Sequence, residues 1–271
     1  MADKVLFDNG THRNILLEDS GSAGNAVQAN QHLIMHNGEA MLLDPGGHKV
    51  YSQVLTKTFS AVGRGRLRYL FLSHQDPDIV AAVNGWLMTT DATAYISALW
   101  QRFVPHFGLD HLLEHRLLPI PDEGMTFEMG GEKLYAVPGH FLHSPGNFQI
   151  YDPVAKILYS GDLGAALGME YIEVTDFDAH LQYMEGFHRR YMTSKRAMTA
   201  WANMVRKLDI DIIAPQHGAV FSGKPMVKRF IDWCANLDCG VDLIAPLYKV
   251  PSSVSSARAA VGIEALVPSR K

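Results

Sequence analysis

Short apolar runs bounded by turn residues recur along the chain and predict strands. The first two runs, 32–36 and 40–43, flank the dipeptide Asn37-Gly38, which is a strong signal for a hairpin turn. Glycine and proline punctuate the later runs in the same way. The expected strands are 32–36, 40–43, 68–73, 94–96, 126–129, 133–137, 148–151, 156–159 and 210–214.

Apolar residues at helical spacing, with charges between them, predict helices in the intervening segments. The longest pattern covers 178–208, where Leu181, Met184, Phe187 and Tyr191 have the spacing of a stripe that faces the core. The expected helical segments are 79–88, 98–107, 109–115, 178–208 and 224–236. Strands and helices in this mixed order predict an α/β layered domain.

The division of the chain follows from its composition. No internal repeat and no clear linker interrupts residues 1–250, so we expect one domain there. After Pro251 the sequence turns to Ser, Ala and Val, and we expect 251–271 to form a C-terminal tail.

Composition and charge exclude several classes of function. The net charge is −4 with no block of Lys and Arg, which argues against nucleic-acid binding. No apolar run reaches the ~20 residues of a membrane span. Only two cysteines occur, Cys234 and Cys239, and the N-terminus lacks a signal pattern, so we expect a cytoplasmic protein with idle or buried thiols.

Four of the expected strands are followed directly by a loop that carries His or Asp. Loops at the carboxyl ends of strands are where α/β domains build their sites, because the rigid sheet holds the residues that the loop presents. A single histidine at such a place is more often a turn or core residue. The same residue types at four strand ends predict a shared site, built from the loops at 74–78, 138–146, 160–162 and 215–218.

The segment 74–78 is the most informative of these loops. His74, Asp76 and Asp78 alternate within five residues, and Pro77 keeps Asp76 out of helical conformation. Close carboxylates repel one another and lose hydration unless a cation lies between them. The segment therefore predicts a metal site; a helix N-cap is the alternative for Asp78.

The four motifs together resemble the metallo-β-lactamase superfamily. They are His-x-Asp-x-Asp at 74–78, His143 in His-Ser-Pro-Gly, Asp162 in Ser-Gly-Asp, and His217 in Pro-Gln-His-Gly. The similarity runs from about residue 30 to 237. It implies a metallo-β-lactamase-like αββα sandwich, with two mixed sheets flanked by helices.

Within that superfamily, the first motif is similar to the flavodiiron and oxygen-binding diiron proteins. Zinc hydrolases usually have His-x-His-x-Asp-His there, whereas this chain has an acidic Asp76 at the second position and Ile79 at the last. Carboxylates favour iron or manganese over zinc. The resemblance implies two Fe ions, with Mn or Zn as alternatives, and open positions that bind O2 or NO. The implied ligands are His74, Asp76 and His143 for one metal, Asp78 and His217 for the second, and Asp162 as the bridge.

Three departures from the family pattern affect this assignment. Asp76 is one methylene shorter than the family Glu. Ile79 cannot ligate, so we expect the second metal to be weaker, more open or ligated by another residue. The chain shows no flavodoxin-like extension, so we expect no flavin and an external redox or signalling protein partner. The resemblance also implies a homodimer.

His140 is the rival of His143, since it lies three residues earlier in the same loop. We prefer His143 because it lies in the His-Ser-Pro-Gly match, and we expect His140 to lie next to the ligand set. The other histidines are expected on the surface or in packing: His32, His36, His106, His111, His115, His180 and His188.

The sequence thus predicts a non-haem diiron protein that binds O2, as an oxygen sensor or carrier. One alternative is an O2 or NO reductase fed by an external electron donor. Another is a metal-dependent hydrolase of the same superfamily, and a degenerate scaffold without activity is the last.

Overall fold

The structure of this chain is a computed structural model that describes residues 3–17 and 28–250. The expected tail at 251–271 lies outside the described residues. The assignment of 1–250 to one domain stays a prediction. No helix in the described part is long and apolar enough to cross a membrane.

The first sheet has seven strands, arranged in the order in which they occur along the chain. Strands β1 to β4 pair antiparallel, and β4 to β7 pair parallel, so the sheet is mixed. Its strands are β1 (Lys4–Asp8), β2 (His12–Leu17), β3 (Gln31–His36), β4 (Glu39–Leu43), β5 (Arg66–Phe71), β6 (Thr93–Ser97) and β7 (Leu117–Ile120).

The second sheet has six strands in the order β13-β12-β11-β10-β9-β8. All its pairs are antiparallel except β11 with β12. The strands are β8 (Met125–Met129), β9 (Glu132–Pro138), β10 (Phe148–Asp152), β11 (Ile157–Gly161), β12 (Ile212–Pro215) and β13 (Phe221–Ser222).

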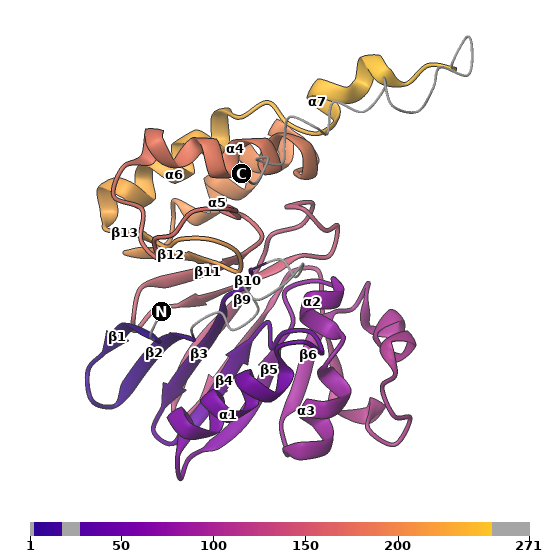
Figure 1. Cartoon of the computed structure of the whole chain (residues 1–271), viewed down its shortest axis with the longest axis vertical. Coiled ribbons are helices and arrows are strands. Elements are labelled where there is room, and N and C mark those ends of the chain that lie inside the picture. Colours follow the sequence, from indigo (N-terminus) through magenta and orange to yellow (C-terminus); the bar gives the residue numbers. More distant parts are fainter. Residues whose placement is uncertain (1–2, 18–27, 251–271) are drawn as a thin grey trace.

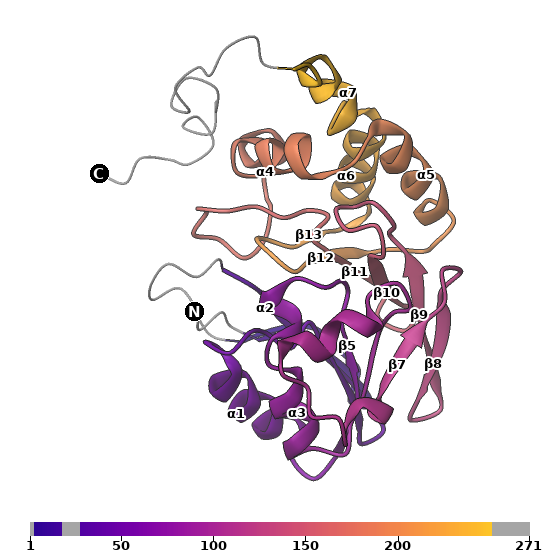
Figure 2. The ribbon, with the colours of Figure 1, turned by 90° about the vertical axis from the view of Figure 1, so that its right-hand side faces the viewer.

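Helices cover the outer face of each sheet (Figures 1 and 2). The first sheet is covered by α1 (Tyr51–Val62) and α3 (Val83–Thr89), with α2 (Pro77–Val80) at its edge. The second sheet is covered by α4 (Phe177–Tyr191), α5 (Lys195–Val205) and α6 (Lys224–Asn236). The remaining short elements are the 3-10 helices η1 (Gln101–Phe107), η2 (Glu114–Arg116) and η3 (Ala245–Leu247), and α7 (Val241–Ile244).

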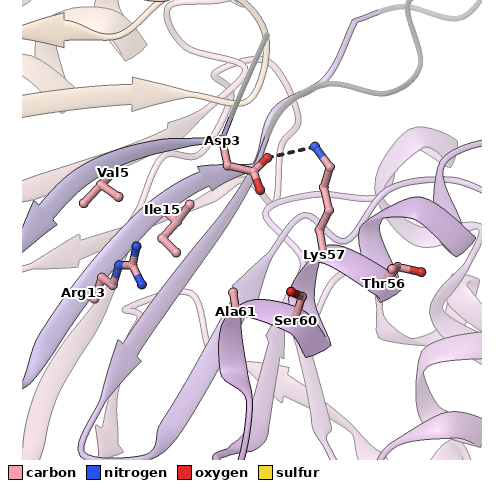
Figure 3. A pocket seen from close by; sticks show the side chains of 8 residues that line it. All are labelled: Asp3, Val5, Arg13, Ile15, Thr56, Lys57, Ser60 and Ala61. Atoms are coloured by element: carbon pink, nitrogen blue, oxygen red, sulfur yellow. Dashed lines mark hydrogen bonds and ion pairs between the residues drawn. The ribbon is translucent and has the colours of Figure 1, made fainter.

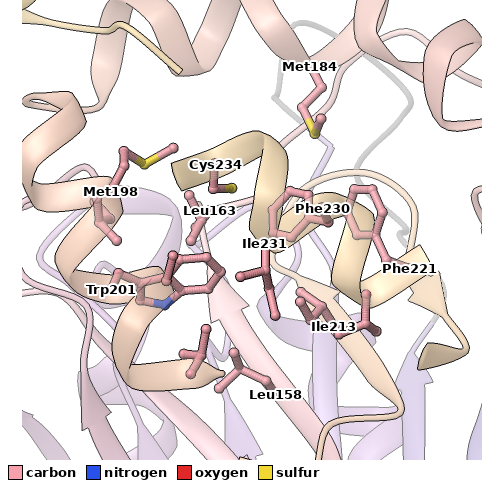
Figure 4. Packing of buried hydrophobic residues seen from close by; sticks show 14 of the residues in the cluster. Leu158, Leu163, Met184, Met198, Trp201, Ile213, Phe221, Phe230, Ile231 and Cys234 are labelled. Atoms are coloured by element: carbon pink, nitrogen blue, oxygen red, sulfur yellow. The ribbon is translucent and has the colours of Figure 1, made fainter. Parts of the chain in front are cut away.

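Three apolar clusters hold these four layers together. One lies between α1, α3 and the first sheet, one between the two sheets, and one between the second sheet and α4 to α6. In the last cluster Trp201, Phe230 and Ile231 pack against Leu158 and Ile213 of the sheet (Figure 4). Burial of this apolar surface drives the layers together. The expected αββα sandwich with two mixed sheets is confirmed.

The expected strands all correspond to strands of the structure, with ends shifted by a few residues. The expected helix 178–208 was wrong as a single element, because it is two helices separated at 192–194. The Ser194 side chain accepts a hydrogen bond from Ala197 N and begins α5 as its N-cap. Helix 79–88 is likewise divided into α2 and α3. The pattern also missed α1 and the strands β1, β2, β7 and β13.

A buried polar network crosses between the two sheets. His12 Nε2 donates to Asp152 Oδ2 at 2.7 Å, and Asn14 Nδ2 donates to the same oxygen at 2.7 Å. Asp152 Oδ1 accepts from the backbone N–H groups of Val154 and Ala155. The Asp152 side chain is fully buried, so these donors replace the water that it loses on folding.

Replacing Asp152 by Ala would leave His12 Nε2 buried without its acceptor and would leave Asn14 Nδ2 with Tyr159 Oη alone. We expect Asp152→Ala to lower the free energy of unfolding by roughly 3–5 kcal/mol, because several buried donors lose their acceptor and each such loss costs roughly 1–3 kcal/mol. Urea unfolding would measure it. Glu185→Ala is the control, because it removes only the exposed ion pair with Arg189 on α4 and is expected to cost less than about 1 kcal/mol. Equal losses in the two variants would contradict a structural role for the network.

Candidate metal centre

The predicted loops converge at one edge of the sandwich. His74 follows β5, His143 lies in the loop between β9 and β10, Asp162 follows β11, and His217 follows β12. Asp76 and Asp78 lie at the start of α2, which begins at Pro77 and directly follows the His74 loop. The six residues that the sequence singled out therefore lie around one centre.

Asp162 is the middle of this arrangement, because its two oxygens face different partners. Its Oδ2 lies 2.8 Å from His143 Nε2 and 3.7 Å from His74 Nε2. Asp76 Oδ2 closes this first group, at 3.5 Å from His143 Nε2 and 3.6 Å from His74 Nε2. The donor atoms of His74, Asp76, His143 and Asp162 all lie within 4.8 Å of one another.

The second group lies on the other side of the same carboxylate. Asp162 Oδ1 lies 3.5 Å from His217 Nε2, and Asp78 Oδ2 lies 3.4 Å from that nitrogen. Asp78 therefore faces His217, and no side-chain hydrogen bond caps the start of α2. The geometry is that of two adjacent half-sites that share one carboxylate.

The residues fit a bound cation. His74 Nε2 and Asp162 Oδ1 are buried and lack a hydrogen-bond partner among the described residues. Buried polar atoms without a partner are rare, because they lose water and gain nothing in exchange. Imidazole and carboxylate groups that converge in this way are typical ligands of iron, manganese and zinc.

The charges within the site are strongly coupled. Burial would raise the pKa of Asp162, but the imidazoles of His74, His143 and His217 outweigh it and hold this pKa well below its usual value. Burial likewise opposes the charging of His143, yet the carboxylates of Asp162 and Asp76 raise its pKa to about 10. The carboxylates thus stabilise a positive charge at the centre. A bound metal ion would supply that charge in place of the proton on His143.

Hydrogen bonds on the far side of the imidazoles aim them at the centre. His74 Nδ1 lies 2.9 Å from Ser73 Oγ, and the Ser73 backbone N–H donates to Asp44 Oδ1. His217 Nδ1 donates to Gln28 O at 2.5 Å. In both histidines Nε2 is the atom that faces the carboxylates. Partners of this kind fix the ring orientation of metal-binding histidines.

Other side chains, from the same loop and from distant segments, hold the loop backbones. Asn147 Nδ2 donates to Leu142 O next to His143, and Asn30 Nδ2 donates to Pro215 O and Gly218 O on either side of His217. His188 Nε2 accepts from Gly164 N, two residues after Asp162. Sequence reasoning placed His188 in packing and did not connect it with the site.

Two aromatic rings of α4 lie beside His143. The Phe187 centroid is 6.1 Å and the Tyr191 centroid 5.9 Å from the His143 ring, and the two aromatic rings stack on each other. The spacing predicted that Tyr191 faces the core, but its residue is 57% exposed. Within the stripe Met184 is fully buried, Leu181 and Phe187 are partly buried against the core, and Tyr191 is the last residue of α4.

Two other predicted residues lie outside the cluster of donor atoms. His140 packs on Phe148, and its Nε2 donates to Asp122 O at 2.9 Å. Ile79 is fully buried and packs with the first sheet and its helices. Ile79 therefore stabilises the apolar core behind α2 and adds no donor atom to the site.

A pocket elsewhere lacks comparable chemistry. It lies between the hairpin β1–β2 and α1, where Lys57 Nζ donates to Asp3 Oδ1 at 2.8 Å (Figure 3). Its other lining residues are Val5, Arg13, Ile15, Thr56, Ser60 and Ala61, none of which is His, Cys or an acidic residue.

The chain is similar to several known proteins. A family model described as ODP family beta lactamase matches residues 27–218. The structure of a peroxy diiron species of a chemotaxis sensor ODP is 40% identical with a TM-score of 0.80, and the match covers 92% of this chain and 100% of that one. The apo state of the chemotaxis sensor ODP from T. denticola is similarly 40% identical with a TM-score of 0.80, covering 91% and 99% of the two chains.

More distant proteins are also similar to this chain. A flavo di-iron protein variant from Thermotoga maritima is 19% identical with a TM-score of 0.71, covering 86% of this chain and 60% of that one. An uncharacterized protein of Methanocaldococcus jannaschii is 21% identical over 204 residues, or 72% of this chain. The chain spans about half the length of this curated relative, 50% of it.

The shared carboxylate predicts a characteristic pattern of metal loss. Asp162→Ala is expected to lose both ions because both half-sites use that carboxylate, whereas His217→Ala is expected to lose mainly the one beside Asp78. Elemental analysis of protein purified without added metal would measure the ions per chain.

His140→Ala is the matched control for His143→Ala, since both histidines lie in the same loop. We expect His143→Ala to lose metal and His140→Ala to retain it. Equal metal loss from the two variants would contradict the assignment of His143 in place of His140.

Proposed function

Since this chain belongs to the ODP family beta lactamases, we propose that it is a non-haem diiron protein that binds O2, as an oxygen sensor or carrier. The proposal draws on the 40% identity to chemotaxis sensor ODP structures, one of which is described as a peroxy diiron species. In that role the ligands would be His74, Asp76 and His143 at one iron and Asp78 and His217 at the other, with Asp162 between them.

The single observation that carries the proposal is the two-sided placement of Asp162. One oxygen lies near His74 and His143, which Asp76 also faces, and the other lies near His217, which Asp78 also faces. A carboxylate in this position would hold two ions next to each other. Three carboxylates among six ligands make the site hard, which favours iron or manganese over zinc.

The surroundings of the site support binding of a small molecule. Bound iron would supply the electrons needed to hold O2. The protein would position the iron ligands and leave one side of the site open to solvent. Asp76 and Asp78 have side chains that are 34% and 38% exposed, whereas Asp162 is only 5% exposed. A small molecule would therefore approach from the side of Asp76 and Asp78, and Phe187 and Tyr191 would shield the His143 side.

Ile79 supports an open second half-site. At this position the flavodiiron pattern has a histidine, and the Ile79 side chain is directed into the apolar core instead. The half-site formed by Asp78 and His217 thus has fewer protein donors than the one formed by His74, Asp76 and His143. We expect the ion there to be more weakly held and more accessible.

The remaining parts of the proposal concern cofactor and partners. We expect no flavin on this chain, a cytoplasmic homodimer, and a separate redox or signalling protein that responds to the site. The homodimer is what the resemblance to oxygen-binding diiron proteins implies, and the cytoplasmic location is inferred from the small number of cysteines.

Metal content and optical spectra would test the function. We expect about two irons per chain without flavin absorbance, and a new absorption band when the reduced protein meets O2. A band that persists for minutes without added reductant supports a sensor or carrier. Rapid decay with continued O2 consumption in the presence of a donor would favour the reductase. Zinc in place of iron, with no spectral response to O2, would contradict diiron O2 binding and favour a hydrolase.

A further inference from the structure

We infer that Gln75, Ser144 and Trp100 form a hydrogen-bond chain that positions the Asp76 carboxylate and connects the state of the metal site to Trp100. The inference rests on the proposed metal site, because Asp76 is one of its proposed ligands. Gln75 and Ser144 each adjoin a proposed ligand in the sequence. Trp100 immediately precedes η1 and lies at the opposite end of the hydrogen-bond series from Asp76.

Three contacts link Trp100 to Asp76. Trp100 Nε1 donates to Ser144 Oγ at 2.9 Å, and Ser144 Oγ donates to Gln75 Oε1 at 2.6 Å. Gln75 Nε2 donates to Asp76 Oδ1 at 3.1 Å. Asp76 Oδ2, the other oxygen, is the one that faces His74 and His143.

The direction of these hydrogen bonds is determined by the two ends. An indole N–H only donates, and a carboxylate only accepts. Ser144 Oγ therefore accepts the hydrogen bond from Trp100 Nε1 and donates its own O–H to Gln75 Oε1. A flipped Gln75 amide would place its oxygen against the Asp76 carboxylate, which is repulsive. A single arrangement thus satisfies all four groups.

This arrangement positions Asp76. The Gln75 amide holds Oδ1, so the carboxylate cannot rotate without losing that bond, and Oδ2 stays directed at the two imidazoles. Such support matters here because Asp76 is shorter than the glutamate of the family pattern. Partners of this kind typically change metal affinity by 10–100-fold.

The same chain leads from the site toward the surface. Ser144 is buried, whereas Trp100 is half-buried and its ring contacts that of Phe103, which is 40% exposed. A bound metal would withdraw negative charge from the Asp76 carboxylate. The hydrogen bond that this carboxylate accepts from Gln75 Nε2 would then become weaker. Since the hydrogen bonds of a chain polarise one another, the change would extend to the Trp100 N–H.

Zinc loading followed by NMR of the indole N–H groups would test the inference. Zinc is chosen because it is diamagnetic and has no redox chemistry, so it causes neither paramagnetic broadening nor a paramagnetic shift. We expect zinc to move the Trp100 resonance, which Trp100→Phe would assign. In Ser144→Ala, which removes only one hydroxyl, we expect this movement to be lost and zinc release to a chelator to become about 10-fold faster.

Ser97→Ala is the matched control. Ser97 is also a buried serine close to Trp100, but its hydroxyl accepts from Leu99 N and has no link to Asp76. We expect this variant to behave as the wild type in both measurements. Retention of either the wild-type shift or the wild-type release rate in Ser144→Ala would overturn the inference.

The two proposals fail in different ways. If the wild-type chain binds zinc and shows the shift but its iron form does not respond to O2, the proposed function fails and the hydrogen-bond chain stands. If the iron form binds O2 while Ser144→Ala behaves as the wild type, only the hydrogen-bond chain fails. A wild-type chain that takes up no metal would overturn both.

Discussion

The candidate site depends on one buried carboxylate that faces two sets of ligands. Asp162 is almost completely buried, and one of its oxygens has no hydrogen-bond partner in the described part of the chain. A buried negative charge is costly unless cations or donors surround it. Three imidazoles surround Asp162, and the carboxylates of Asp76 and Asp78 lie beside them. The pair of metal ions that we propose would satisfy all of these groups at once.

The αββα fold meets this requirement because it brings separate loops to one edge. The ends of β5, β11 and β12 and the loop after β9 lie in two different sheets, which pack face to face through an apolar cluster. The rigid sheets hold the loops, and asparagine side chains such as Asn30 and Asn147 hold the loop backbones. The geometry of the centre is thus a property of the whole sandwich and not of any one segment.

Much of the site was accessible from the sequence because its ligands lie in short motifs. His74, Asp76 and Asp78 alternate within five residues, and the other motifs follow apolar runs that were recognised as strands. The break between α4 and α5 was missed because the apolar pattern continues across it, and the capping role of Ser194 has only a weak sequence signal. Tyr191 was misplaced because spacing alone does not show where a helix leaves the core. The partners Asn30 and Trp100 lie 185 and 44 residues from the groups they contact, a separation that one sequence does not reveal.

The most direct test of a shared binuclear centre is anomalous X-ray diffraction at the iron edge from crystals of the iron-loaded protein. Two iron peaks are predicted, one on each side of Asp162, the first among His74, Asp76 and His143 and the second beside Asp78 and His217. A single peak, or iron bound away from Asp162, would contradict the account.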